Sequence, residues 1–197
     1  MDLMALVGAQ SPIELEIGSG RGWFMVERVE ADPTARIVGL EVKRKWATLV
    51  DERLRTRGFG ERARVFAEDA RLALPRFKAG CLGTAYIHFP DPWWKKRHHK
   101  RMVVADPVIS QLVRLLVPGG LLFVQTDVEE RADAYEQLLC AVPQLAGAGP
   151  GKAPRVADNP FGARSPRERK AIEDELPVFR LLYRRLPTTA PEALGQP

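Results

Sequence analysis

The stretch Glu16-Ile17-Gly18-Ser19-Gly20-Arg21-Gly22 decides the fold class of this 197-residue chain. It follows a short apolar run typical of a buried strand and precedes an amphipathic run typical of a helix. Three alternate glycines let the backbone turn tightly and let a ligand approach it with no Cβ in the way. The spacing is GxGxG and not the GxGxxG of dinucleotide-binding proteins, because Trp23 stands three residues after Gly20. The sequence therefore predicts a strand, a ligand-binding turn and a helix in succession.

Outward from this stretch, short apolar runs alternate with longer amphipathic runs, which predicts an α/β domain with a mostly parallel sheet. We expect strands at residues 13–17, 36–41, 63–67, 84–88, 121–126 and 178–185. We expect helices at residues 22–29, 43–57, 107–116 and 129–141, and a last helix that opens at Ser165 and Pro166. The run Leu116-Val117-Pro118-Gly119-Gly120 is expected only to stop a helix.

Residues 143–166 hold nine Gly or Pro residues, which predicts a long loop or crossover. The roughly twenty residues that follow cannot build a core of their own, so they are expected to return to the same sheet. We therefore expect a single domain over residues 1–187 and a disordered polar tail at residues 188–197.

Composition excludes several classes of protein. Hydrophobic residues make up 45% of the chain and charged residues 28%, as in soluble globular domains, and the most apolar window, residues 115–124, is too short to span a membrane. The start of the chain has no basic flank of a secretory signal, so we expect a cytoplasmic protein with no membrane partner. Cys81 and Cys140 lack CxxC or histidine-spaced partners, which predicts reduced thiols in the core and no metal site.

Acidic residues stand at the ends of three successive predicted strands: Glu16, Glu41 and Asp69. Because parallel strands end at one edge of a sheet, we expect these carboxylates to surround one ligand. A GxGxG turn directly after an acidic residue resembles the cofactor loop of S-adenosylmethionine-dependent methyltransferases. In that arrangement Glu41 would accept both ribose hydroxyls, Asp69 the adenine amine, and Glu16 would face the charged amino-acid end or the sulfonium. The alternative, that these residues are only solvated caps around an ordinary turn, stays open on the residues alone.

The stretch His88-Phe89-Pro90-Asp91-Pro92-Trp93-Trp94-Lys95-Lys96-Arg97-His98-His99-Lys100-Arg101 follows the fourth predicted strand. Five Lys or Arg residues and two His residues fall within nine positions from Trp93, against a net charge of only +5 for the whole chain. Cations interleaved with indole rings suit a nucleic acid, because phosphates take the charge and bases stack on the rings. A basic run can also be only a solvated loop.

This stretch resembles the signature of the tRNA (guanine-N7)-methyltransferase family, F-x-D-P-W followed by x-K-[KA]-R-H-x-K-R, nearly position for position from Phe89 to Arg101. Its histidines are then part of an RNA-facing strip, not metal ligands. Gln125-Thr126-Asp127 resembles the family's K-T-D, with Gln in place of Lys, and Ser165-Pro166-Arg167-Glu168 resembles its late T-x-[FY]-E motif. On the residues alone, Asp127 with Glu130 and Ser165 with Glu168 also have the spacing of helix caps.

The resemblance implies a Rossmann-like class I methyltransferase fold, with a mostly parallel, seven-stranded twisted sheet and helices on both faces. It implies methyl transfer from S-adenosylmethionine to N7 of the guanine at position 46, in the variable loop of tRNA, with Asp91 as the catalytic residue. The cofactor-binding residues that it implies are Glu16, Gly18, Gly20, Gly22, Glu41, Asp69 and Asp91. The substrate-binding residues that it implies are Lys95, Asp127, Ser165, Pro166, Arg167 and Glu168.

Three other functions remain open at this stage. A nucleotide-dependent oxidoreductase would share the fold and Glu41, although the GxGxG spacing disfavours it. A methyltransferase-fold protein that binds RNA without turnover would keep the basic stretch. A small-molecule methyltransferase would have no use for that stretch.

Overall fold

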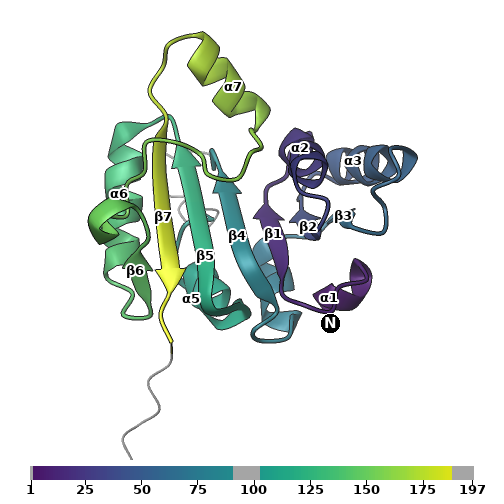
Figure 1. Cartoon of the computed structure of the whole chain (residues 1–197), viewed down its shortest axis with the longest axis horizontal. Coiled ribbons are helices and arrows are strands. Elements are labelled where there is room, and N and C mark those ends of the chain that lie inside the picture. The colour runs from purple at the N-terminus through teal and green to yellow at the C-terminus, as the bar shows by residue number, and fades with distance from the viewer. Residues whose placement is uncertain (1, 91–102, 188–197) are drawn as a thin grey trace, which may run out of the picture.

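The computed structural model describes residues 2–90 and 103–187 (Figure 1). The segment 91–102 and the tail 188–197 lie outside the described residues. The predictions made for Asp91, for Lys95, for the basic stretch and for a disordered tail therefore fall outside them too.

The described residues form a seven-stranded sheet in the order β3-β2-β1-β4-β5-β7-β6. The strands are β1 (Ile13–Ile17), β2 (Ile37–Leu40), β3 (Ala63–Phe66), β4 (Leu82–His88), β5 (Leu116–Thr126), β6 (Leu145–Gly147) and β7 (Phe179–Arg185). The first five strands pair in parallel, and β7 runs antiparallel between β5 and β6. The predicted mostly parallel, seven-stranded sheet is confirmed.

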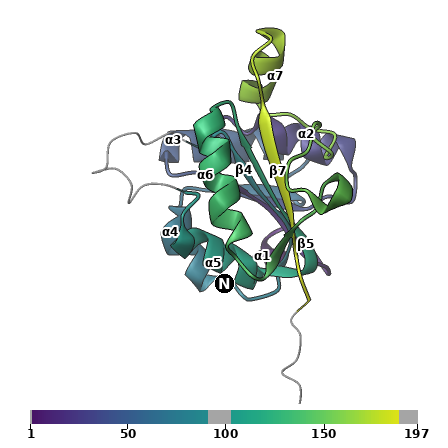
Figure 2. The ribbon, with the colours of Figure 1, turned by 90° about the vertical axis from the view of Figure 1, so that its left-hand side faces the viewer.

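Helices cover both faces of this sheet. They are α1 (Leu3–Leu6), α2 (Trp23–Ala31), α3 (Arg44–Thr56), α4 (Ala70–Ala73), α5 (Asp106–Leu115), α6 (Glu129–Cys140) and α7 (Pro166–Glu173), with 3-10 turns η1 (Leu74–Arg76) and η3 (Pro150–Lys152). One buried cluster joins α1, α4, α5 and α6 to one face, and a second joins α2 and α3 to the other. The helix α7 stands apart, beyond the carboxyl ends of β4 and β5 (Figures 1 and 2).

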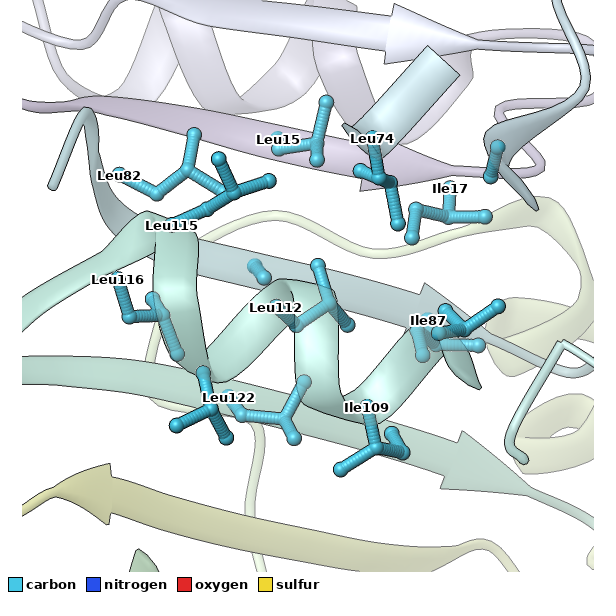
Figure 3. Packing of buried hydrophobic residues seen from close by; sticks show 14 of the residues in the cluster. Leu15, Ile17, Leu74, Leu82, Ile87, Ile109, Leu112, Leu115, Leu116 and Leu122 are labelled. Carbon is cyan, nitrogen blue, oxygen red and sulfur yellow. The ribbon is translucent and has the colours of Figure 1, made fainter. Parts of the chain in front are cut away.

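The core follows from the period-two alternation of each strand. Leu15 and Ile17 of β1 point to the face that α5 covers, where they belong to one buried cluster with Leu112 and Ile109 of α5 and Ile87 of β4 (Figure 3). All five side chains are at least 96% buried. Both faces of the central strands are covered, so residues on the opposite face, such as Tyr86 of β4 and Phe123 of β5, are buried as well, as is typical of parallel sheets.

Two predictions about the second half of the chain, for residues 143–166 and 116–120, are wrong. The segment 143–166 is not wholly a loop, because it contains β6 and η3. Gly147 ends β6, where it pairs with Tyr183 of β7. A Cβ there would lie 2.2 Å from the carbonyl oxygen of Lys152, so only glycine fits. The run 116–120 is not only a helix stop, because β5 begins at Leu116, directly after α5. A register shift in the β4–β5 pair accommodates the Pro-Gly-Gly run as an irregularity within the strand.

Both cysteines are free thiols, as predicted. Cys81 is buried in the core, and burial raises the pKa of its thiol. Cys140 is exposed at the end of α6, so the prediction that it belongs to the core is wrong.

Candidate cofactor and substrate site

The glycine loop after β1 adopts the backbone geometry that its sequence predicts. Gly18, Gly20 and Gly22 have φ values of +77°, +53° and +69°, a region that other residues adopt at a cost. The loop is closed by a hydrogen bond from the N–H of Gly22 to the carbonyl of Ser19, at 2.7 Å. Gly22 is also the N-cap of α2, so the turn leads directly into that helix.

Gly22 is fixed by packing as well as by its backbone angle. A Cβ at this position would lie 2.1 Å from Cγ1 of Val50 in α3. We expect Gly22→Ala to lower the free energy of unfolding by about 2–5 kcal/mol, because it adds an overpacked methyl to a strained φ. Chemical denaturation measures this change. Gly18→Ala, whose Cβ would meet no atom of the described residues within 4 Å, should lose less. Adding Val50→Ala to Gly22→Ala should recover part of the loss, and no recovery would refute the role of this contact.

Glu41, which directly follows β2, forms hydrogen bonds that hold the glycine loop in place. Its Oε2 accepts a hydrogen bond from the N–H of Gly20 at 2.9 Å, and its Oε1 accepts one from the N–H of Lys43 at 2.8 Å. The carboxylate is 7% exposed. Each carboxylate oxygen has a second lone pair, so both can still accept from a ribose hydroxyl. Glu41 therefore shapes the glycine loop and presents an acceptor beside it.

Two cavities open at this end of the sheet. The Glu41 cavity, of about 930 Å³, is lined by Glu41, Asp69, Trp46 and Val108 among others. The Asp127 cavity, of about 490 Å³, is lined by Glu16, Phe24, Thr126 and Asp127 together with the start of α7. The two cavities share the wall formed by Gly18, Gly20, Arg21, His88, Phe89 and Pro90. Both volumes fall within the range of small-molecule sites.

Asp69 lines the Glu41 cavity as the N-cap of α4. Its Oδ1 accepts from the backbone N–H of Arg71 at 2.9 Å, and its carboxylate forms an ion pair with the Arg71 guanidinium. These hydrogen bonds hold the pKa of Asp69 below its usual value. Asp69 is therefore a structural cap that also keeps a charged acceptor at the cavity.

The end of β4 contributes a residue whose role the sequence did not reveal. His88 was predicted as the last residue of the fourth strand, directly before the basic stretch, and its side chain is only 3% exposed. Its Nδ1 lies 2.9 Å from Oε1 of Glu16, which is buried to the same degree. The sequence separation of 72 hides this contact, because only the parallel pairing of β1 with β4 brings the two residues together.

The predicted substrate residues gather at the Asp127 cavity. Asp127, Ser165, Pro166 and Arg167 all line it. Asp127 does not cap α6, whose N-cap is Val128; its carboxylate instead forms an ion pair with Arg167. Arg167 stands at the position where the late family motif has Phe or Tyr, and this ion pair holds its side chain against Asp127.

Glu168 lies behind the Asp127 cavity and not in its lining. Ser165 caps α7 by accepting from the Glu168 N–H at 3.2 Å, as the capping spacing predicts. The Glu168 carboxylate is fully buried, pairs with Arg180 of β7 at 2.9 Å, and accepts from Asn159 at 2.9 Å. Glu168 therefore anchors α7 to the sheet.

Cations and indole rings also meet outside the predicted basic stretch. The Arg21 guanidinium lies 5.1 Å from the ring centroid of Trp46, and that of Arg53 lies 4.7 Å from the ring centroid of Trp23. Lys43 and Arg44 are exposed at the start of α3, and within residues 2–90 and 103–187 neither forms an ion pair. This basic surface borders the Glu41 cavity, which Arg21 and Lys43 line.

The sequence comparisons agree with this geometry. A family model with the description "Putative methyltransferase" matches residues 10–181. A tRNA (guanine-N(7)-)-methyltransferase from Anaeromyxobacter dehalogenans is 41% identical over 170 residues, which cover 86% of this chain and 83% of that protein. The chain belongs to the tRNA (guanine-N7)-methyltransferase family. Another protein of that name, from Myxococcus xanthus, is 35% identical over 91% of this chain and 86% of its own length.

Solved structures agree with the fold of this tRNA (guanine-N7)-methyltransferase family member. TrmN from Thermus thermophilus superposes with a TM-score of 0.61 at 19% identity, over 93% of this chain and 47% of that one. An rRNA methylase from Streptococcus thermophilus superposes with a TM-score of 0.58 at 12% identity, over 94% of this chain and 92% of that one. The expected class I methyltransferase fold is confirmed, and family membership makes the chain an S-adenosylmethionine-dependent enzyme.

The residues around the glycine loop have the chemistry that binding of S-adenosylmethionine requires. Bare glycine backbone, the Glu41 acceptor and the ionised Asp69 line one cavity, as a ribose and an adenine require. Glu16 and His88 line the adjoining Asp127 cavity, and each carries a buried polar atom that has no hydrogen-bond partner among the described residues. Within the described ranges, no group of three metal-ligating side chains occurs and no helix is long and apolar enough to cross a membrane.

Proposed function

We propose that this chain transfers the methyl group of S-adenosylmethionine to N7 of the guanine at position 46, in the variable loop of tRNA in the cytoplasm. The observation that carries the proposal is the shared wall of the two cavities. The cavity with the ribose and adenine acceptors touches the cavity with Asp127 along Gly18, Gly20 and His88. A donor in one cavity and a base in the other would meet at that wall.

Methyl transfer to N7 requires that the methyl group and N7 be aligned and that negative potential lie near the purine. Bound S-adenosylmethionine supplies an electrophilic methyl group, and the methyl carbon–sulfur bond breaks as the bond to N7 forms. The N7 lone pair carries no proton, so the chain needs no general base. The purine becomes cationic, and its developing charge favours a nearby carboxylate. Asp91 directly follows Pro90, which lines both cavities, and we assign that carboxylate to Asp91.

We assign guanine recognition to the Asp127 cavity. A carboxylate accepts from N1–H and the exocyclic amine, the two donors that together distinguish guanine from adenine. Asp127 has a side chain 15% exposed and lies in the cavity lining, so it can reach a base there. Ser165 and Pro166 line the same cavity and are assigned to the substrate, and Lys95 is assigned to phosphate or to the O6 acceptor. The basic surface at Arg21, Lys43 and Arg44 suits the tRNA backbone.

Asp127→Asn tests this assignment. We expect kcat/KM for tRNA to fall about 10- to 100-fold, because the amide accepts at only one atom, while the KM for S-adenosylmethionine stays unchanged. Steady-state methylation with each substrate varied in turn measures both constants. Asp133→Asn in α6 is the matched control, because Asp133 is exposed and pairs with Arg155 away from the cavity. Equal losses in the two variants would contradict the assignment.

The function itself is tested with purified protein, unmodified tRNA and labelled S-adenosylmethionine. We expect 7-methylguanine, located by alkali-labile scission at position 46. Binding of tRNA and cofactor without transfer would identify an RNA-binding protein, and methylation of small acceptors only would identify a small-molecule enzyme. Tight binding of NADH in place of S-adenosylmethionine would identify an oxidoreductase.

A further inference from the structure

A row of polar side chains crosses one face of the sheet at its carboxyl edge. His88 of β4 stands in register with Gln125 of β5, which stands in register with Arg180 of β7. Glu16 of β1 joins the row through its contact with His88. Glu16 is 2% exposed, His88 9% and Gln125 0%, so three polar side chains are buried side by side.

This row contains polar atoms with no partner. Within the described residues, Oε2 of Glu16, Nε2 of His88 and both amide atoms of Gln125 have no hydrogen-bond partner. Burying such atoms unpaired is costly, and native proteins rarely leave several together unless a ligand or water completes them. Glu16 and His88 both line the Asp127 cavity, and His88 also belongs to the wall that this cavity shares with the Glu41 cavity. Two of the residues that carry unpaired atoms, Glu16 and His88, therefore belong to the lining of a ligand site.

The imidazole of His88 is held rigidly. Its ring centroid lies 4.2 Å from that of Phe24, 5.6 Å from that of Tyr86 and 6.0 Å from that of Phe123. Three aromatic contacts fix the ring plane, so Nδ1 can meet Glu16 in only one orientation. A fixed hydrogen bond to Oε1 fixes in turn the direction of Oε2, the free oxygen of that carboxylate.

We infer that His88 is a positioning residue, which holds the Glu16 carboxylate so that its free oxygen receives the α-ammonium group at the amino-acid end of the cofactor. This inference rests on the proposed function only in its choice of cofactor. It also accounts for Gln125, which occupies the position where the quoted family motif has Lys. A lysine there would place a cation in the same buried row, whereas here the imidazole of the neighbouring strand supplies the donor to Glu16.

The test uses two ligands that differ only at the end in question. S-adenosylhomocysteine carries the amino-acid end, and 5′-methylthioadenosine lacks it. His88→Phe keeps an aromatic ring against Phe24 and removes both ring nitrogens. By calorimetric titration, we expect this variant to bind S-adenosylhomocysteine about 10-fold or more weakly, since hydrogen bonds to charged groups contribute on that scale. Its affinity for 5′-methylthioadenosine should stay within about twofold of the wild type.

Two further variants separate positioning from folding. His88→Phe should have no further effect in a Glu16→Gln background, because the two residues act as one unit. Adding Gln125→Lys to His88→Phe should recover part of the lost affinity by supplying another hydrogen-bond donor in the same buried row. Tyr86→Phe is the matched control, because the Tyr86 hydroxyl donates to Glu14 and not to Glu16.

Unchanged binding of both ligands in His88→Phe, or equal losses for both, would overturn the inference. The result is independent of methyl transfer. A wild-type protein that binds S-adenosylhomocysteine but methylates no tRNA would refute the proposed function, while the ligand comparison would still decide the role of His88.

Discussion

Asp91→Ala is expected to abolish methyl transfer, with a loss of at least about 1,000-fold in the single-turnover rate constant. The reason is electrostatic: as N7 takes the methyl group the purine becomes cationic, and a preorganised group aimed at developing charge contributes on this scale. The same variant should bind S-adenosylmethionine nearly as well as the wild type, because the contacts we assign to the nucleoside come from Glu41 and Asp69. Rapid-quench measurement with saturating tRNA and labelled cofactor gives the rate constant.

Asp91→Asn is the companion variant, since it keeps the size and hydrogen-bonding shape of the side chain and removes only its charge. If the charge is decisive, Asn should be nearly as inactive as Ala. Single-turnover methylation at the wild-type rate in either variant would remove Asp91 from the mechanism.

Glu41→Ala is expected to weaken S-adenosylmethionine binding by about 100-fold or more. Two losses combine: the ribose loses its acceptor, and the N–H groups of Gly20 and Lys43 lose the oxygens that they reach at 2.9 and 2.8 Å. An unpaired buried donor costs about 1–3 kcal/mol, so the glycine loop should lose its shape as well as its ligand contact. Equilibrium binding measures the affinity.

Two controls keep the result for Glu41 interpretable. Glu68→Ala removes a carboxylate that lines the same cavity but pairs with Arg76 at the surface, and it should leave affinity nearly unchanged. Glu41→Gln keeps one acceptor oxygen, so its affinity should fall between those of the wild type and Glu41→Ala. Wild-type affinity in Glu41→Ala would show that this carboxylate does not hold the ribose.

The sequence was sufficient for the features that depend on local pattern. Alternate glycines between an apolar run and an amphipathic run predicted the loop at Gly18 and Gly20, and the structure places both at the wall between the cavities. The spacing of Ser165 and Glu168 likewise predicted the cap of α7. In both cases the physical cause lies within a few residues of chain, where periodicity and backbone preference act directly.

Features that depend on tertiary contact were not predictable. The partner of Glu16 is 72 residues away, and a histidine at the head of a basic stretch is more readily interpreted as part of that stretch. Glu41 was predicted as a ligand contact, but its hold on Gly20 requires the exact path of the loop over the end of β2. The strand β6 was missed because Gly147 weakens a strand by propensity, and only crowding against Lys152 makes glycine necessary there.

The position of β7 has a consequence for how this enzyme is made. The strand inserts between β5 and β6 and carries Arg180, the anchor of Glu168 and hence of α7. A nascent chain that has emerged from the ribosome only as far as residue 174 would contain the glycine loop and α7, yet β5 would present an open edge that can template aggregation. The part of the site that α7 builds beside Asp127 is thus completed only when β7 has paired with β5.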